Sequence, residues 1–314
     1  MALPDVGRLA LGCAPLGNLY RATTDDAAQA TIDAAWEAGI RLFDTAPLYG
    51  HGVSEARVGP SLARRPRGEF LLSTKVGRLL VPDPGGAAAR AGIFADAPHL
   101  RPEPDFSRDG VRRSIDASLD RLGLDRIDLV HLHDPDDHLE QARREAHPAL
   151  AELRDEGVIG AIGVGTNWAH VADVFVGDVE LDCVLLAGRH TLLEQTGTPD
   201  LFDRCRALGI TVLAAGVLNS GILARPEPGA RYDYAPASHE QVARAQHLAA
   251  VCGRHGVPLA AAALQYPLRH PAVSVVLVGA GSPEEVVEDR RLLDHPIPDA
   301  CWDDLDAEGI PVRW

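Results

Sequence analysis

Lysine is almost absent from this sequence of 314 residues. Of its thirty lysine and arginine residues, only Lys75 is a lysine, and aromatic residues make up only 5% of the chain. Acidic residues outnumber basic ones, so the formal net charge is −15. Surfaces that bind nucleic acid or anionic membranes need clustered positive charge, so this balance argues against both as partners.

Membrane, leader and disulfide signals are also missing. No run of about 20 apolar residues predicts a membrane span. The N-terminal MALPDVGRLALG has neither the basic start nor the apolar core of a signal peptide. The five cysteines are scattered, odd in number and form no CxxC motif. This favours reduced, mostly buried thiols over a disulfide scaffold or a zinc ribbon, so we expect a cytoplasmic protein.

Short apolar runs alternate with longer amphipathic stretches along the chain. The short runs do not alternate cleanly between apolar and polar residues, which is typical of parallel strands buried on both faces. These predicted strands cover 9–13, 41–44, 70–75, 127–132, 161–165, 182–186, 211–215 and 274–278. Apolar spacing near 3.6 predicts helices at 24–38, 107–122, 139–156, 200–208 and 239–255.

This alternation, without a break in composition, predicts one domain over residues 1–314 with an α/β fold. Eight strands in such a chain favour a single (β/α)8 TIM barrel. A doubly wound sheet with an appended helical piece is the alternative, but no GxGxxG follows the first strand. Residues 79–105 show no clear period and predict a long loop after the third strand. Such a loop lies at the active-site end of a barrel and is typical of a lid or a binding segment.

Polar residues follow three neighbouring predicted strands. Asp44, Lys75 and His133 stand at strand ends, and Tyr49 follows Asp44 by five residues. A buried lysine beside a tyrosine favours the phenolate and lowers the tyrosine pKa. The aspartate would hold the lysine, and the histidine would donate a hydrogen bond to a substrate oxygen. Each residue alone has an ordinary structural explanation, but the four together indicate a proton-transfer site.

Four stretches of the sequence resemble the aldo-keto reductase superfamily, and the resemblance extends over nearly the whole chain. They are GIRLFDTAPLYGHGVSE (39–55), STKVG (73–77), RLGLDRIDLVHLHDPD (121–136) and GVIGAIGVGTN (157–167). APLGNLY (14–20) and LLAGRHTLLEQ (185–195) are most similar to the branch of aldose 1-dehydrogenases, acting on L-fucose or D-threo-aldoses, and pyridoxal 4-dehydrogenases. The resemblance implies a barrel that binds a nicotinamide dinucleotide without a Rossmann domain. It assigns the catalytic tetrad to Asp44, Tyr49, Lys75 and His133, with Tyr49 as general acid or base.

The resemblance also implies a cofactor site along the strand ends. Asn167 would bind the carboxamide, and His190 would replace the aromatic residue that stacks on the nicotinamide. Asn219, Ser220 and Gly221 match the loop that covers the pyrophosphate. The remaining implied cofactor positions are Gly12, Gly279, Ala280, Ser282, Glu285, Glu288 and Asp289.

Some of these positions bear on the choice between NAD and NADP. Gly279 and Glu285 stand where NADPH-selective relatives carry lysine and arginine. Glu285 would repel a 2′-phosphate and accept a hydrogen bond from a free ribose hydroxyl, although an acid also suits the first turn of any helix. Glu288 and Asp289 match the adenine-contacting pair. We therefore expect NAD in preference to NADP.

Together these features predict an NAD-preferring aldose 1-dehydrogenase that oxidises an anomeric hydroxyl to a lactone. Tyr20, Leu48, Trp168 and the 79–105 segment would line the substrate pocket. The alternatives are a pyridoxal 4-dehydrogenase or a general aldehyde or ketone reductase of the same family, and a cofactor-binding protein without turnover. A metal-dependent hydrolase is a remote alternative, because His131 and His133 have the HxH spacing of some zinc sites. A small molecule is the expected partner, and the sequence leaves the oligomeric state open.

Overall fold

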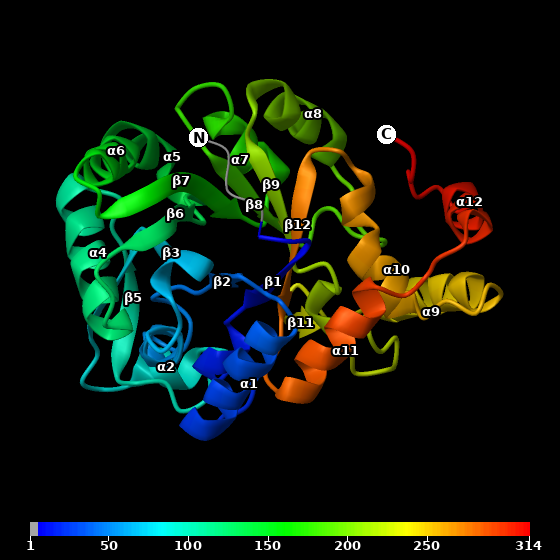
Figure 1. The fold of residues 1–314 in the computed structure, drawn as a ribbon, viewed down its shortest axis with the longest axis horizontal. Helices are drawn as coiled ribbons and strands as arrows, with labels where there is room; N and C mark the ends of the chain where they lie inside the picture. The colour runs from blue at the N-terminus through cyan, green and yellow to red at the C-terminus, as the bar shows by residue number, and fades with distance from the viewer. Residues whose placement is uncertain (1–5) are drawn as a thin grey trace.

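Eight parallel strands form a closed barrel in the order β1-β12-β9-β8-β7-β6-β3-β2 (Figure 1). This computed structural model describes residues 6–314, so the start of the segment tested above for a signal peptide lies outside the described residues. Every predicted strand overlaps one strand of the barrel, which confirms the predicted TIM barrel. The barrel strands are β1 (Leu9–Gly12), β2 (Leu42–Asp44), β3 (Leu71–Val76), β6 (Ile127–His133), β7 (Ile159–Thr166), β8 (Cys183–Ala187), β9 (Thr211–Ala215) and β12 (Val273–Gly279).

Helices surround the barrel (Figure 1). The Thr24 and Ser107 side chains accept backbone N–H groups at the starts of α1 (Asp25–Glu37) and α4 (Arg108–Leu122), which explains why the sequence predicts both helices well. The predicted helix at 139–156 is divided into α5 (Leu139–Gln141), a π-helical turn over Ala142–Ala146, and α6 (His147–Asp155). The other helices are α1 (Asp25–Glu37), α2 (Val53–Leu62), α4 (Arg108–Leu122), α7 (Ala169–Phe175), α8 (Thr198–Leu208), α9 (His239–Gly253), α10 (Leu259–Gln265), α11 (Pro283–Leu293) and α12 (Asp299–Ala307).

Two hydrophobic clusters make up the core. The larger one fills the space between the outer faces of the strands and the helices. The smaller one fills the barrel and includes Ala10, Leu42, Leu129, Cys183 and Leu277. Because side chains alternate along a strand, the residues two positions further along these strands also face the interior. Those positions carry the site described below.

The predicted long loop at 79–105 follows β3 as an ordered excursion that contains secondary structure of its own. Strands β4 (Arg78–Pro82) and β5 (Leu100–Pro104) pair antiparallel, and the short helix α3 (Ala87–Ala91) lies between them. The Tyr20 N–H donates to the Ile93 carbonyl (2.8 Å) and the Ala95 N–H to the Asn18 carbonyl (2.9 Å). The excursion is therefore fastened to the loop that follows β1.

A second, smaller hairpin follows β9. Its strands are β10 (Arg231–Tyr232) and β11 (Ala235–Pro236), and both turn residues between them, Asp233 and Tyr234, have positive φ angles (47° and 64°). The Arg189 guanidinium binds both carboxylate oxygens of Asp233, at 3.0 and 2.8 Å. This pair fastens the hairpin to the loop after β8.

All five cysteines are buried free thiols, as the scattered pattern predicts. None of the helices within residues 6–314 has both the length and the apolar character needed to cross a bilayer.

Candidate active site

The inward-facing residue nearest the C-terminal end of each barrel strand divides the barrel into two halves. On β2, β3 and β6 these residues are Asp44, Lys75 and His133. On the other five strands they are the small residues Gly12, Gly165, Ala187, Ala215 and Gly279. One half of the barrel mouth is therefore polar, whereas the other, bare half has only glycine or alanine at these positions.

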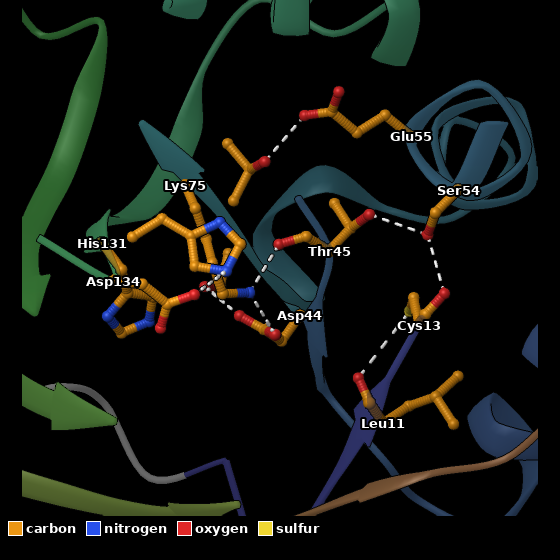
Figure 2. Close-up of polar contacts among 12 residues, drawn as sticks. Leu11, Cys13, Asp44, Thr45, Ser54, Glu55, Lys75, His131 and Asp134 are labelled. Carbon is orange, nitrogen blue, oxygen red and sulfur yellow. Dashed lines mark hydrogen bonds and ion pairs between the residues drawn. The ribbon is translucent and has the colours of Figure 1, made fainter. Parts of the chain in front are cut away.

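Lys75 and Asp44 form a buried ion pair in the polar half (Figure 2). The Lys75 Nζ lies 2.6 Å from the Asp44 Oδ2 and 2.8 Å from the Thr45 carbonyl oxygen, and both charged side chains are only 2% exposed. The Ser73 hydroxyl donates to the other oxygen of Asp44 at 2.7 Å. A compact ammonium fits this space, whereas the planar guanidinium of the arginines used elsewhere in the chain is larger.

Tyr49 lies in the turn between β2 and α2. The Lys75 Nζ is 4.7 Å from the centre of its ring, and the His133 ring lies edge-on to it with centroids 6.1 Å apart. The turn approaches the loop after β1 so closely that a Cβ on Gly50 would collide with the Gly17 carbonyl. Glycine is required there, also because Gly50 has a φ of +64°. The structure thus brings the four predicted tetrad residues together.

Hydrogen bonds hold the start of this turn and of α2 in place. The Thr45 and Ser54 hydroxyls lie 2.8 Å apart, and the Ser54 hydroxyl donates to the Cys13 carbonyl (2.8 Å), as Figure 2 shows. The buried Glu55 carboxylate accepts the Thr74 hydroxyl and the Arg121 Nε–H, both at 2.7 Å. The Tyr49 turn is therefore tied to β1 and β3 on either side.

The pKa of Tyr49 differs from the sequence-based expectation. Burial, followed by the negative charge of Asp44, raises the pKa of Tyr49 well above its usual value of 10. The prediction that Lys75 lowers this pKa is therefore wrong for the protein without ligand. The main cause is burial, and the Asp44 carboxylate adds to it although it is paired with Lys75 at 2.6 Å. Tyr49 is thus a protonated phenol at neutral pH.

His133 and His131 are neutral for a similar reason. Burial lowers both pKa values well below 6.5, and the nearby Lys75 charge lowers them further. A neutral His133 can donate one hydrogen bond to a substrate oxygen. His131 is fully buried below it, as expected for an inward-facing residue, with its Nδ1 3.9 Å from the Cys183 Sγ.

The arrangement around His131 does not support the hydrolase alternative. Across residues 6–314, the structure assembles no group of three or more histidine, cysteine, aspartate or glutamate side chains that could hold a metal ion. A catalytic zinc site needs at least three protein ligands, so His131 and His133 alone are too few.

The bare half of the barrel mouth fits a flat, polar ligand such as a nicotinamide. Gly12 and Gly279 are opposite each other in neighbouring strands, and a Cβ on Gly12 would lie 3.4 Å from the Gly279 nitrogen. The buried Asn219 has a φ of 46°, and its Oδ1 has no partner among the described residues. The two glycines place no side chain there, and the Asn219 oxygen offers an unused acceptor, so both features suit such a ligand.

Three further predicted cofactor residues lie on the segments that border this half. Asn167 is half-buried and follows the last residue of β7 by one position. The Ser220 hydroxyl accepts the Tyr234 N–H at 3.1 Å, so the hairpin tip touches the predicted pyrophosphate loop. Ser220 and Gly221 have positive φ angles of 58° and 98°. These positions suit a cofactor that runs from Asn167 toward β12, and their roles stay predictions.

His190 does not face the barrel mouth, so its predicted stacking on the nicotinamide is wrong. The ring is 2% exposed and packs against Phe202, Tyr266, His270 and Trp314, with centroids 4.8 to 5.9 Å apart. Burial lowers the pKa of His190 to about 3. Its Nδ1 is 3.0 Å from the Thr198 hydroxyl, which places the ring against α8. The chain after β8 turns away from the barrel mouth before it reaches His190, and the sequence motif does not show this turn.

The predicted adenosine-binding positions gather at the end of β12 and the start of α11. Ser282 caps the helix by accepting the Glu285 N–H at 3.3 Å. The Glu285 carboxylate accepts the Gly281 N–H at 2.7 Å and lies 3.3 Å from the Arg21 guanidinium. Glu285 therefore caps the helix as well, and its charge is shared with a basic neighbour. Ala280 is buried beside them.

Glu288 and Asp289 face different surroundings one turn further along α11. Both oxygens of Glu288 bind the Arg291 guanidinium, at 2.6 and 2.7 Å, on the exposed side of the helix. Burial and the charges of Glu285 and Glu288 raise the pKa of Asp289 to about 7. A partly protonated Asp289 can donate as well as accept a hydrogen bond, which an adenine edge requires.

Exposed aromatic residues surround the barrel mouth. Tyr20 and Trp168, both predicted from the sequence, are covered by the Arg231 and Arg189 guanidinium groups at 4.6 and 4.5 Å from their ring centres. A cavity of about 480 Å³ is lined by Tyr20 and by residues 89, 90, 92–97 and 99 of the β4–β5 excursion. Leu48 is half-buried directly before Tyr49.

Two aromatic residues near the site were not predicted. Phe94, from the β4–β5 excursion, lies with its ring centroid 6.2 Å from that of Tyr49. Tyr234, at the tip of the β10–β11 hairpin, is close enough to Tyr49 that its ionised form raises the pKa of Tyr49. Each stands in a segment without clear periodicity, so only the folded chain shows its proximity to the site.

Comparisons with known proteins agree with this geometry. The model of the Aldo/keto reductase family matches residues 8–309. A D-threo-aldose 1-dehydrogenase from a Pseudomonas species is 43% identical over 321 residues, covering 99% of this chain and 96% of its own. A pyridoxal 4-dehydrogenase from Microbacterium luteolum is 40% identical over 325 residues, covering 97% and 94%. The structure of an aldo-keto reductase from Bacillus halodurans in its holo form superposes with a TM-score of 0.74 at 26% identity, covering 96% and 91%.

Proposed function

The chain belongs to the aldo-keto reductase family and is an oxidoreductase, and from this premise we propose that it is an NAD-preferring aldose 1-dehydrogenase. The substrate would be an aldose such as L-fucose or another D-threo-type sugar, and its anomeric hydroxyl would be oxidised to give the lactone. One observation carries the proposal: the Tyr49 phenol, the neutral His133 and the buried Lys75–Asp44 pair meet at the barrel mouth.

In the proposed reaction, His133 binds the reacting oxygen through its single N–H and orients it toward Tyr49. In the oxidising direction, the Tyr49 phenolate takes the hydroxyl proton, and in the reducing direction its phenol donates a proton to the carbonyl oxygen. When bound, an oxidised nicotinamide supplies the hydride acceptor and a positive charge that favours the phenolate. Lys75, held by Asp44, keeps an ammonium against the Tyr49 ring and limits the cost of its ionisation.

The cofactor preference rests on Glu285 and Arg21. The Glu285 carboxylate lies at the start of α11, and its ion pair with Arg21 engages a cation that would otherwise be free to hold a 2′-phosphate. A carboxylate there disfavours the extra phosphate of NADP and accepts a hydrogen bond from a ribose hydroxyl.

A pyridoxal 4-dehydrogenase is the second candidate. The 40% identity to such an enzyme favours it, and the hemiacetal of pyridoxal presents the same reacting group as a cyclic sugar. A small molecule is the proposed partner in either case, and the five free thiols suit a reducing cytoplasm.

The test is a screen of L-fucose, other aldoses and pyridoxal with NAD and with NADP, followed by reduced-nicotinamide absorbance. We expect the highest kcat/KM for an aldose with NAD, and we expect Tyr49→Phe to abolish that turnover. Faster oxidation of pyridoxal than of every sugar would assign the second function. Wild-type turnover by Tyr49→Phe would remove Tyr49 from the mechanism.

A further inference from the structure

A carboxylate outside the tetrad lies directly beside the reacting groups. Asp134 follows the last residue of β6, and its backbone adopts a left-handed conformation with a φ of 43°. Its N–H donates to the Gly165 carbonyl at 2.8 Å, which holds the residue against β7. For a residue with a side chain this conformation costs on the order of 1 kcal/mol, and such costs are concentrated at functional sites.

The contacts of Asp134 leave one of its oxygens open. The Oδ2 lies 3.1 Å from the Arg78 guanidinium and 3.6 Å from the His133 Nε2. The Oδ1 makes no hydrogen bond within the part of the chain that the structure describes. About a third of the side chain is exposed. Asp134 therefore offers a hydrogen-bond acceptor that the protein itself does not use.

The charges around Asp134 place it in the same site as the tetrad. Its negative charge raises the pKa of both Tyr49 and Tyr234, so it lies within electrostatic reach of the proton donor and of the hairpin tip. Burial raises the pKa of Asp134, and the Arg78 guanidinium at 3.1 Å acts against that rise. The ion pair with Arg78 favours the carboxylate form of Asp134 beside His133.

We infer that Asp134 binds the hydroxyl on the carbon next to the reacting carbon of the substrate, which in an aldose is the 2-hydroxyl. The inference rests on the proposed function. The His133 N–H holds the reacting oxygen, and neighbouring gauche oxygens of a sugar lie about one hydrogen-bond length apart, near 3 Å. The second oxygen therefore comes within reach of a carboxylate whose Oδ2 is 3.6 Å from the His133 Nε2.

The chemistry of the acceptor restricts what can bind there. An ionised carboxylate only accepts hydrogen bonds, so its partner must carry a proton, as a hydroxyl does and an ether or a carbonyl oxygen does not. A substrate without this hydroxyl leaves a half-buried anion without its partner. Sites built to bind a hydroxyl discriminate strongly against analogues that lack it. Asp134 thus determines specificity for sugars over 2-deoxy compounds and simple aldehydes.

The test compares L-fucose with 2-deoxy-L-fucose in the wild type and in variants. We expect the wild type to favour L-fucose by about 10- to 100-fold in kcat/KM, the range of one hydrogen bond to a charged group. In Asp134→Gly this ratio falls to within about threefold, and in Asp134→Asn, which keeps a neutral acceptor, it falls part of the way. Asp134→Gly suits the left-handed backbone, so the test does not depend on the folding of a strained variant.

The matched control is Asp137→Asn, which removes the same charge from an exposed position three residues further along the chain. This control keeps the wild-type ratio. Sugar turnover with an unchanged ratio in both Asp134 variants, or with no 2-deoxy discrimination in the wild type, overturns the inference and leaves the proposed function standing. A wild type that oxidises pyridoxal but no sugar overturns both.

Discussion

Replacement of Lys75 by methionine tests the central feature of the site. Methionine has a similar length and fills much of the same space, but it leaves the Asp44 carboxylate buried with only the Ser73 hydroxyl as a side-chain partner. Both members of the pair are 2% exposed, so water cannot take the place of the ammonium. Breaking a buried pair from one side costs about 3–5 kcal/mol, because an uncompensated charge stays in the core.

The double variant Asp44→Asn with Lys75→Met separates this charge effect from a loss of packing. Asparagine keeps the shape of Asp44 and can still accept the Ser73 hydroxyl, so no buried charge is left. Replacing a whole buried pair by neutral groups is close to neutral for stability. We therefore expect the double variant to recover about 2–4 kcal/mol relative to Lys75→Met, while both remain inactive.

The assay is urea unfolding at 25 °C, followed by circular dichroism, with stability taken from the midpoint and the slope. The control is Arg113→Met, which breaks an exposed ion pair with Asp109 and changes stability by less than about 0.5 kcal/mol. A loss below about 1 kcal/mol for Lys75→Met, or a double variant no more stable than the single one, would refute the buried charged pair.

Three further outcomes follow from other parts of the structure. Glu285→Arg should shift the NADP/NAD ratio of kcat/KM upward by about 10- to 100-fold, since it replaces a repelling charge with a phosphate-binding one and releases Arg21. Glu285→Gln, which only removes the charge, should give a ratio between those of the wild type and Glu285→Arg. An unchanged ratio in both variants would contradict the cofactor proposal. The pKa of His190 is lowered to about 3 in the folded state against about 6.5 unfolded, so its stabilisation is present above pH 6.5 and lost as the pH falls toward 3. Wild-type stability in urea should therefore decline more than that of His190→Phe, by about 2 kcal/mol between pH 6 and pH 4, and parallel curves would contradict this. Sugar oxidation should rise with pH above neutrality, because the reaction needs the Tyr49 phenolate and the pKa of Tyr49 is raised in the free protein. Carbonyl reduction, which needs the phenol, should stay flat near neutrality. A flat oxidation profile in steady-state rates would contradict Tyr49 as the base.

The sequence predicts those parts of the molecule that depend on local patterns. The eight barrel strands are short apolar runs between helices with clear caps, such as Thr24 and Ser107, and all eight are found. The tetrad residues are predictable because three of them, Asp44, Lys75 and His133, occupy strand ends, and parallel strands bring their ends together in any closed barrel.

The parts that the sequence does not predict depend on contacts between distant segments. The β4–β5 excursion is stabilised by pairing with residues 18–20, and no period within residues 79–105 shows this. His190 keeps the motif position of a stacking aromatic residue, but it packs outward among Phe202, Tyr266 and Trp314. The pKa of Tyr49 is raised first by burial and then by the Asp44 charge, and both depend on the folded geometry and not on residue type.

The raised pKa of Tyr49 changes the role that Lys75, the only lysine in the sequence, must have. An ammonium already paired with Asp44 at 2.6 Å cannot by itself hold the half-buried phenol ionised, and the free protein keeps Tyr49 protonated. Lys75 still lies 4.7 Å from the centre of the Tyr49 ring, so any added positive charge nearby acts on a phenol whose ionisation is already partly compensated. The bare half of the barrel mouth, lined by Gly12 and Gly279, is where an oxidised nicotinamide would bring that charge. A bound oxidised nicotinamide would thereby favour ionisation of Tyr49, the proposed base.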